Sequence, residues 1–181
     1  MDWIKLAGVR ILMLVGCIFV MHYLHEFGHA FAAKSLGYDV ELTINKVISA
    51  ASRETAPLLH LILIAAGGPL VTMILSVLAY LARSRLGMLA PIIIFNALAM
   101  RVIAAIISIS NPNDEAWISS ALGLGTWTVP ALVCVFLSAI FVLIARENRL
   151  RIGWYLAMWI GISIGYTSVV MGENAFPQFA F

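Results

Sequence analysis

Five long apolar segments constrain the fold of this chain more than any other feature of its sequence. An α-helix needs about 20 predominantly apolar residues to cross the hydrocarbon core of a bilayer. Segments of about this length or longer cover residues 3–36, 56–81, 87–110, 127–145 and 152–171. We therefore predict an all-α, polytopic membrane protein with about five transmembrane helices.

The composition agrees with this fold class. Of the 181 residues, 62% are hydrophobic and only 11% are charged, whereas soluble domains are about half apolar and a quarter charged. The mean hydropathy is +1.00. Because the formal net charge is only +2 and no basic arm or aromatic-interleaved basic stripe occurs, we expect no nucleic-acid partner. The two cysteines, Cys17 and Cys134, lie in apolar runs and indicate no disulfide framework.

The segment between the first two apolar runs has a different pattern. Polar and apolar residues alternate from residue 39 to residue 47, which favours a strand or hairpin, with a plain surface loop as the alternative. No linker or repeat divides the chain, so we expect one membrane domain over residues 1–181. Residues 3–125 would form its core, and residues 126–181 would add two transmembrane helices.

Lysine and arginine are distributed unevenly between the two sides that five crossings define. By the positive-inside rule, the side richer in these residues is cytoplasmic. This predicts a cytoplasmic N-terminus, and it places the C-terminal end of the first helix on the opposite face, together with the loop around residue 114. The richer side holds Lys5, Arg10, Arg83, Arg85, Arg146, Arg149 and Arg151, and the other side holds Lys34, Lys46 and Arg53.

The residues with the clearest chemistry lie at the end of the first apolar run. The stretch HEFGH places His25 and His29 one helical turn apart, so both imidazoles face the same side and can bind one zinc ion. Glu26 can then act as general base towards a zinc-bound water. The alternative is a histidine pair that is merely hydrogen-bonded in a core. An ionisable residue inside a membrane helix raises the free energy of the folded protein in the bilayer, so its presence favours the functional interpretation.

The run HEFGHAFAAKSLGYDV resembles the active-site helix of the site-2-protease family of intramembrane zinc metalloproteases. In that family, small residues and a glycine follow the second histidine, and here these are Ala30, Ala32, Ala33 and Gly37. Family members continue with a sheet-like segment, a helix with a Gly-Pro element and a region that supplies an aspartate ligand. This chain has the alternating segment, then AAGGPL, then NPNDEA. The order of these features matches over about residues 4–125.

The resemblance implies a zinc-dependent intramembrane endopeptidase with one Zn²⁺ per chain. His25, His29 and Asp114 would hold the ion, Glu26 would be catalytic, and residues 3–125 would be the catalytic core. Asp114 is followed by Glu115 rather than by the glycine of the family pattern. Glu115 therefore competes for the role of third ligand, and a solvated helix cap is the alternative role for Asp114.

The resemblance also implies a substrate and a location. The substrate would be a membrane protein, cut in or near its transmembrane segment within the lipid bilayer. We expect the chain itself to be a multi-pass protein of the cytoplasmic (inner) membrane of a prokaryote. Well-known family members hold the zinc site nearer the cytosolic face, whereas the charge distribution here places it on the opposite face.

Several polar residues are candidates for supporting roles. His22 shares the face of the two histidines and could orient a ligand or form a hydrogen bond in the core. Arg101 needs an anion such as Asp114 or Glu115, or else reaches towards an interface. Asn96 could bind a substrate backbone or connect two helices by a hydrogen bond.

The Gly-Gly-Pro stretch is a candidate of a different kind. Gly67 and Gly68 lack side-chain bulk, and Pro69 lacks a backbone donor, so the second helix can bend or approach another backbone closely. A role in shaping the cleft and a role in helix packing are equally compatible with this pattern.

Two other classes of function are compatible with the composition. A catalytically inactive relative could bind membrane helices as an adaptor or complex subunit, but the intact HEFGH stretch argues against it. A small metal or proton transporter would place polar residues along several helices, whereas here they converge at one end of the first helix and one loop. The sequence predicts no particular oligomeric state.

Overall fold

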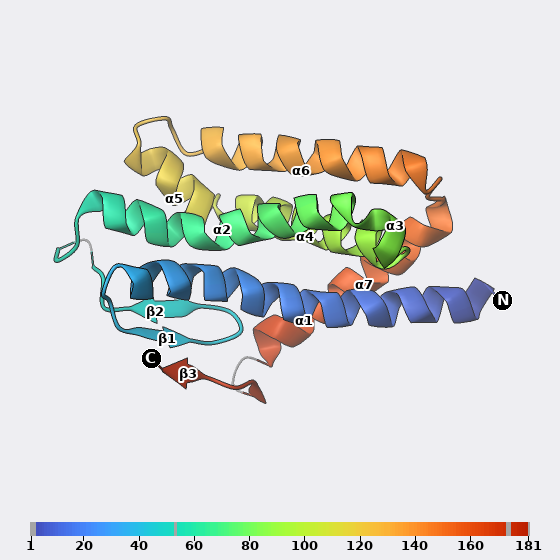
Figure 1. Cartoon of the computed structure of the whole chain (residues 1–181), viewed down its shortest axis with the longest axis horizontal. Helices are drawn as coiled ribbons and strands as arrows, with labels where there is room; N and C mark the ends of the chain where they lie inside the picture. The colour runs from blue at the N-terminus through green and yellow to red at the C-terminus, as the bar shows by residue number, and fades with distance from the viewer. Residues whose placement is uncertain (1–2, 53, 173–174, 181) are drawn as a thin grey trace.

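The computed structural model describes residues 3–52, 54–172 and 175–180, which form a helical bundle with a small sheet near one end (Figure 1). Five of its helices are long and apolar enough to cross a membrane, as the sequence predicted. These are α1 (Trp3–Ser35), α2 (Leu58–Leu81), α4 (Leu89–Ile107), α6 (Thr128–Glu147) and α7 (Ile152–Met171). Two short helices, α3 (Arg83–Leu86) and α5 (Asp114–Ala121), lie between them in sequence. The strands are β1 (Val40–Leu42), β2 (Val47–Ser49) and β3 (Phe179–Ala180).

The outer surface of the bundle is apolar, as a lipid-facing surface must be. Leu12 on α1, Val135 on α6 and Trp159 on α7 expose 73%, 68% and 64% of their surface. Exposed apolar side chains on this scale would favour aggregation in water. In a bilayer they are solvated by lipid, so the pattern supports a multi-pass membrane protein.

Glycine ends α1 and turns the chain into the sheet. Gly37 has a φ of +87°, a left-handed conformation that costs glycine little because it has no Cβ. The Tyr38 N–H donates to the Ala33 carbonyl at 3.1 Å, which satisfies one of the last carbonyls of the helix. The chain therefore reverses directly after the helix that carries the histidines.

The alternating segment is a β-hairpin, which settles the choice between strand and loop. β1 pairs antiparallel with β2, with Glu41 opposite Ile48. Val40 and Leu42 are buried against Ala30 and Ala33 of α1, so the small residues after the second histidine make room for the sheet. The sequence did not predict that β3, near the C-terminal end of the chain, pairs with the other edge of β1.

The two glycines Gly28 and Gly67 bring α1 and α2 into backbone contact. A Cβ placed on Gly28 would lie 2.8 Å from the Gly67 carbonyl carbon, and a Cβ on Gly67 would lie 2.7 Å from the Gly28 carbonyl carbon. Only glycine at both positions allows this approach. The crossing places the following residue of α2, Gly68, against the histidines of α1.

On a different face of α1, α7 packs through a second pair of glycines. Gly161 contacts Leu14, and Gly165 contacts Ile18; both apolar side chains are fully buried. Two small residues that lie four positions apart leave a groove on the surface of a membrane helix. The side chains of a neighbouring helix fit into this groove. The central helix α1 is thus held between α2 and α7.

The segments that hold most of the basic residues lie at the end of the bundle opposite the HEFGH stretch, whereas Lys34 and Lys46 belong to segments at the same end as that stretch (Figure 1). The N-terminal part of α1, the short helix α3 and the turn between α6 and α7 share one end. The hairpin, α5 and the C-terminal half of α1 share the other. This is the partition that the distribution of lysine and arginine predicted, although Arg53 lies outside the described residues.

Candidate metal centre

Three side chains from two helices that are far apart in the sequence lie close together in the structure. His25 and His29 extend from α1, and Asp114 is the first residue of α5, which follows the N-cap residue Asn113. The Nε2 atoms of the two histidines are 3.2 Å apart. Asp114 Oδ2 lies 3.3 Å from Nε2 of His25 and 3.5 Å from Nε2 of His29. This group could hold a metal ion.

The hydrogen bonds of the other ring nitrogens orient both imidazoles. His29 Nδ1 lies 2.7 Å from the carbonyl oxygen of Ile64, so Nδ1 donates. His25 Nδ1 lies 3.1 Å from Thr72 Oγ1, and that hydroxyl donates in turn to the Gly68 carbonyl. Because each Nδ1 is the donor, the Nε2 of each neutral imidazole keeps a lone pair that can face a cation, and Arg101 Nη2 lies 3.4 Å from the Nε2 of His25.

The carboxylate of Asp114 is held in its ionised form. Burial alone would raise the pKa of this carboxyl group, but the adjacent His25 and His29 imidazoles hold the pKa well below its usual value. Two imidazole nitrogens and a carboxylate oxygen at these distances repel one another unless a proton or a cation lies between them. The site is therefore built around a positive charge.

Arg101 and Glu115 form a buried ion pair beside His25, His29 and Asp114. Arg101 Nη1 donates to Glu115 Oε1 at 3.0 Å and lies 3.6 Å from Asp114 Oδ2. Both Arg101 and Glu115 are 4% exposed. Because Arg101 belongs to α4 and Glu115 to α5, the ion pair holds the two helices together and keeps Asp114 opposite the histidines. Of the two outcomes that the sequence left open for Arg101, the structure shows pairing.

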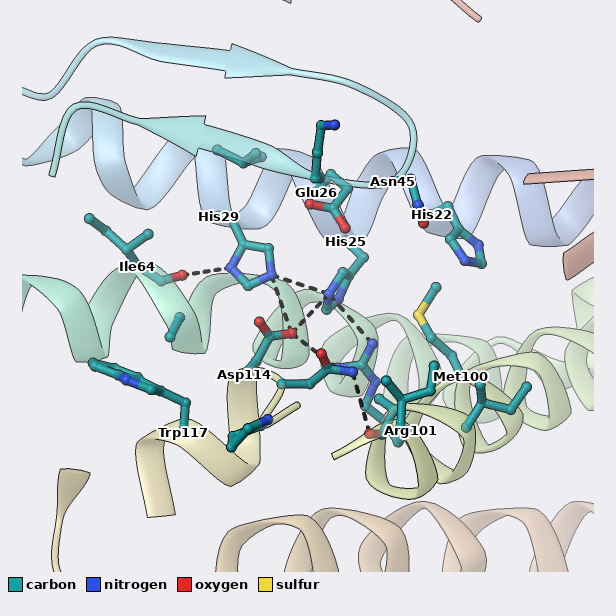
Figure 2. A pocket seen from close by; sticks show the side chains of 18 of the residues that line it. His22, His25, Glu26, His29, Asn45, Ile64, Met100, Arg101, Asp114 and Trp117 are labelled. Atoms are coloured by element: carbon teal, nitrogen blue, oxygen red, sulfur yellow. Dashed lines mark hydrogen bonds and ion pairs between the residues drawn. The ribbon is translucent and has the colours of Figure 1, made fainter. Parts of the chain in front are cut away.

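His25, His29 and Asp114 line a cavity of about 640 Å³ between the hairpin and the helices. Glu26 lines the same cavity and is 9% exposed. Figure 2 shows its carboxylate on the side of the two histidines that faces the hairpin, whereas Asp114 and Arg101 lie on the other side. Residues of the hairpin, among them Asn45 and Lys46, also line the cavity.

Two of the remaining candidates stand apart from the three ligands. His22 lines the cavity, but its Nδ1 contacts the Ile18 carbonyl at 2.9 Å and its ring packs edge-on against Tyr166. Asn96 is fully buried between helices, where it accepts a hydrogen bond from the Tyr166 hydroxyl at 3.3 Å and lies near Cys17. The structure thus places Asn96 in a helix-to-helix contact.

The Gly-Gly-Pro stretch of α2 packs against the part of α1 that carries the histidines. Gly67 faces Gly28, and Pro69 is buried within α2, which continues through it. Gly68 lies directly behind the imidazoles, because a Cβ placed on it would lie 2.7 Å from His25 Nδ1 and would overlap His29 Nε2. Gly67 thus allows close helix packing, one of the two roles that the sequence suggested, and Gly68 leaves room for the two imidazoles.

Sequence reasoning missed two groups that orient the ligands. Thr72 is fully buried and lies four residues after Gly68, so a polar side chain on the glycine face of an apolar helix was the available signal. The Ile64 carbonyl gave no signal, because every residue has one. Trp117 of α5 also lines the cavity and was not anticipated.

We expect Gly68→Ala to empty the site while leaving the bundle folded. The added methyl group would overlap His29 Nε2 and displace the imidazoles, and displaced outer-shell geometry typically lowers metal affinity by about 10- to 100-fold. Metal content per purified chain measures this. Gly16→Ala is the matched control, because a Cβ there meets nothing within 4 Å. Full metal retention by Gly68→Ala would contradict the expected overlap.

No protein-family model, curated protein or solved structure matches this chain.

Proposed function

We propose that this protein is a zinc-dependent intramembrane endopeptidase that hydrolyses a peptide bond in or near a transmembrane segment of another membrane protein. The observation that carries the proposal is the convergence of His25, His29 and Asp114 in a cavity that Glu26 also lines. This group sits in a bundle whose helices are suited to a bilayer. A metal site with a carboxylate beside it, at membrane depth, matches the needs of peptide hydrolysis there.

The ligand atoms fit zinc. Zinc binds imidazole nitrogen and carboxylate oxygen at about 2.0–2.2 Å in a tetrahedron, which separates neighbouring ligand atoms by about 3.3–3.6 Å. The three ligand atoms here are 3.2–3.5 Å apart. Three protein ligands leave a fourth position open, as catalytic zinc sites require.

Zinc, when bound, lowers the pKa of a water molecule towards neutrality and polarises the scissile carbonyl. Glu26 accepts the proton that water loses as its oxygen bonds to the carbonyl carbon. It then returns that proton to the amide nitrogen as the carbon–nitrogen bond breaks, so the products are one carboxylate chain and one amine chain. The Arg101–Glu115 pair holds Asp114 in place throughout, and Thr72 keeps His25 oriented.

The hairpin offers an edge for an unwound substrate. β1 lies between β2 and β3, so both of its edges are already paired. Within the described part of the chain, β2 pairs only with β1, and Val47 and Ser49 of β2 line the cavity. A substrate helix must unwind before its carbonyls can be attacked, and strand addition on β2 would replace its lost hydrogen bonds.

The order of features along the chain supports a relationship with site-2 proteases. The HEFGH helix, the hairpin, the helix with Gly67 and Gly68, and the later Asp114 follow one another as in that family, and all of them border one cavity or its supporting helices. By that resemblance the substrate is a single-span membrane protein. We also propose a prokaryotic cytoplasmic membrane and a cytoplasmic N-terminus, which the basic residues favour.

Removal of the metal tests the proposal. Wild-type protein should contain about one zinc per chain and should cleave a single-span model substrate in liposomes. A chelator should lower cleavage by about a thousandfold or more, since Lewis-acid stabilisation is worth several kcal/mol. Added Zn²⁺ should restore it, whereas Mg²⁺ should not.

The same experiment separates the competing functions. Wild-type protein that carries no zinc and cuts nothing, yet retains the transmembrane substrate on purification, would overturn the protease proposal in favour of an adaptor. Metal movement across the liposome membrane without cleavage would instead indicate a transporter.

A further inference from the structure

A second cavity lies at the end of the bundle opposite the metal centre. It has a volume of about 410 Å³ and lies between the N-terminal part of α1 and the turn that joins α6 to α7. Figure 1 shows these two segments at the same end of the molecule. Three arginines from the two segments line the cavity: Arg10, Arg149 and Arg151.

The positive charge in this cavity has no counter-charge among the described residues. No acidic side chain in that part of the chain lines the cavity, and none forms an ion pair with the three arginines. Glu147, the nearest acid in sequence to Arg149, contacts Arg83 at 2.6 Å and the Tyr80 hydroxyl at 2.9 Å instead. The Arg10 Nε is buried and has no hydrogen-bond partner within the described ranges. Three guanidinium groups gathered in this way attract an anion.

The N-terminus of α7 adds to the positive electrostatic potential that the three arginines create in the cavity. No side chain caps this helix at Arg151, and the first residues of a helix have backbone N–H groups without intrahelical partners. Ile152 and Gly153, which begin α7, line the cavity. The positive end of the helix dipole therefore points to where the arginines gather.

The positions of the arginines in the sequence indicate how deeply they lie in the bilayer. Arg10 directly precedes the uninterrupted apolar run of residues 11–21, and Arg151 directly precedes α7. Both therefore lie where the hydrocarbon core gives way to the headgroups. Leu6, Leu150 and Trp154 give the cavity an apolar wall next to its charged one. A ligand for this cavity needs an anionic group on an apolar body.

We propose that this cavity binds the phosphate-bearing headgroup of an anionic phospholipid. Basic residues at this depth attract anionic lipids, with about a fivefold gain in affinity for each lysine or arginine. The arginines and the open helix start would bind the phosphate, and the apolar wall would lie along the glycerol and the first carbons of the acyl chains. This site is separate from the metal centre and does not depend on the proposed protease activity.

Native mass spectrometry of the full chain in neutral detergent tests the proposal. With equal amounts of phosphatidylglycerol and phosphatidylcholine, wild-type protein should retain phosphatidylglycerol preferentially. Arg149→Gln and Arg151→Gln should each lower that affinity by about fivefold, and the triple variant with Arg10→Gln by about a hundredfold. Arg149 and Arg151 are exposed, so the single variants should fold even if the triple variant does not.

Arg85→Gln is the matched control, because Arg85 is an exposed arginine at the same end of the bundle that does not line the cavity. It should bind phosphatidylglycerol as wild type does. Equal losses for Arg85→Gln and Arg149→Gln would indicate general surface charge and overturn the site. Displacement of the lipid by millimolar inorganic phosphate would show a free-phosphate site and overturn the lipid assignment.

Discussion

Replacing Glu26 by glutamine is expected to lower the rate of peptide cleavage by about 10²- to 10⁴-fold, the usual contribution of a general base. Glutamine has nearly the shape of glutamate but cannot accept the proton of the attacking water. Because Glu26 is not among the three ligands, the zinc content should remain that of the wild type. Cleavage of a single-span substrate and metal analysis of the same preparation measure the two quantities.

Glu41→Gln is the matched control for this prediction. Glu41 lies on β1 with an exposed side chain and does not line the cavity, so the same chemical change there should leave cleavage unaltered. Wild-type cleavage by Glu26→Gln would mean that the proton is carried by another group, and the proposed mechanism would fail. Loss of zinc from Glu26→Gln would instead show that this carboxylate is a ligand.

Asp114→Asn is expected to release the metal, with a loss of affinity greater than the roughly 10- to 100-fold that outer-shell changes cause. The variant replaces the only carboxylate oxygen that lies within 3.5 Å of both histidine nitrogens among the described residues. An amide is a far weaker zinc ligand than a carboxylate. Zinc content and a competition titration with a chelator measure the effect.

Glu115→Gln is the isosteric comparison that decides between the two acidic residues. Its amide oxygen can still accept the hydrogen bond from Arg101, so zinc affinity should fall by no more than about tenfold. Some loss is expected, because Arg101 also lies 3.6 Å from Asp114 and would pair with it once the charge of Glu115 is gone. The opposite result, with zinc kept by Asp114→Asn and lost by Glu115→Gln, would make Glu115 the third ligand.

Asp114 and Glu115 show why only the family resemblance, and not the residues themselves, favoured one of two adjacent acidic residues. Both open the same short helix, where successive side chains point about 100° apart. Only the placement of α5 against α4 decides which of them faces the histidines. The buried Arg101 settles this by binding Glu115, and its pairing partner was one of the alternatives that the sequence left open.

The hairpin was predictable as a pattern but not as a sheet. Alternation over residues 39–47 indicates a strand through the period of two of its side chains. This alternation does not indicate which edge of the hairpin pairs with a further strand. That β3 pairs with β1 and leaves the outer edge of β2 beside the cavity follows from contacts between residues more than 130 positions apart.

Three features could be predicted from the amino-acid sequence alone: the five apolar helices, the gathering of most basic residues at one end, and the placement of His25 and His29 on one helical face. Each of these follows from hydrophobicity or from the period of a single element, and both are local properties. The folded chain was needed to show that Asp114 lies against both histidines, that Gly68 and Thr72 of α2 lie behind the imidazoles, and that Arg10 lines one cavity with the turn before α7. These contacts depend on how helices cross, and helix crossings are fixed by packing between segments far apart in sequence.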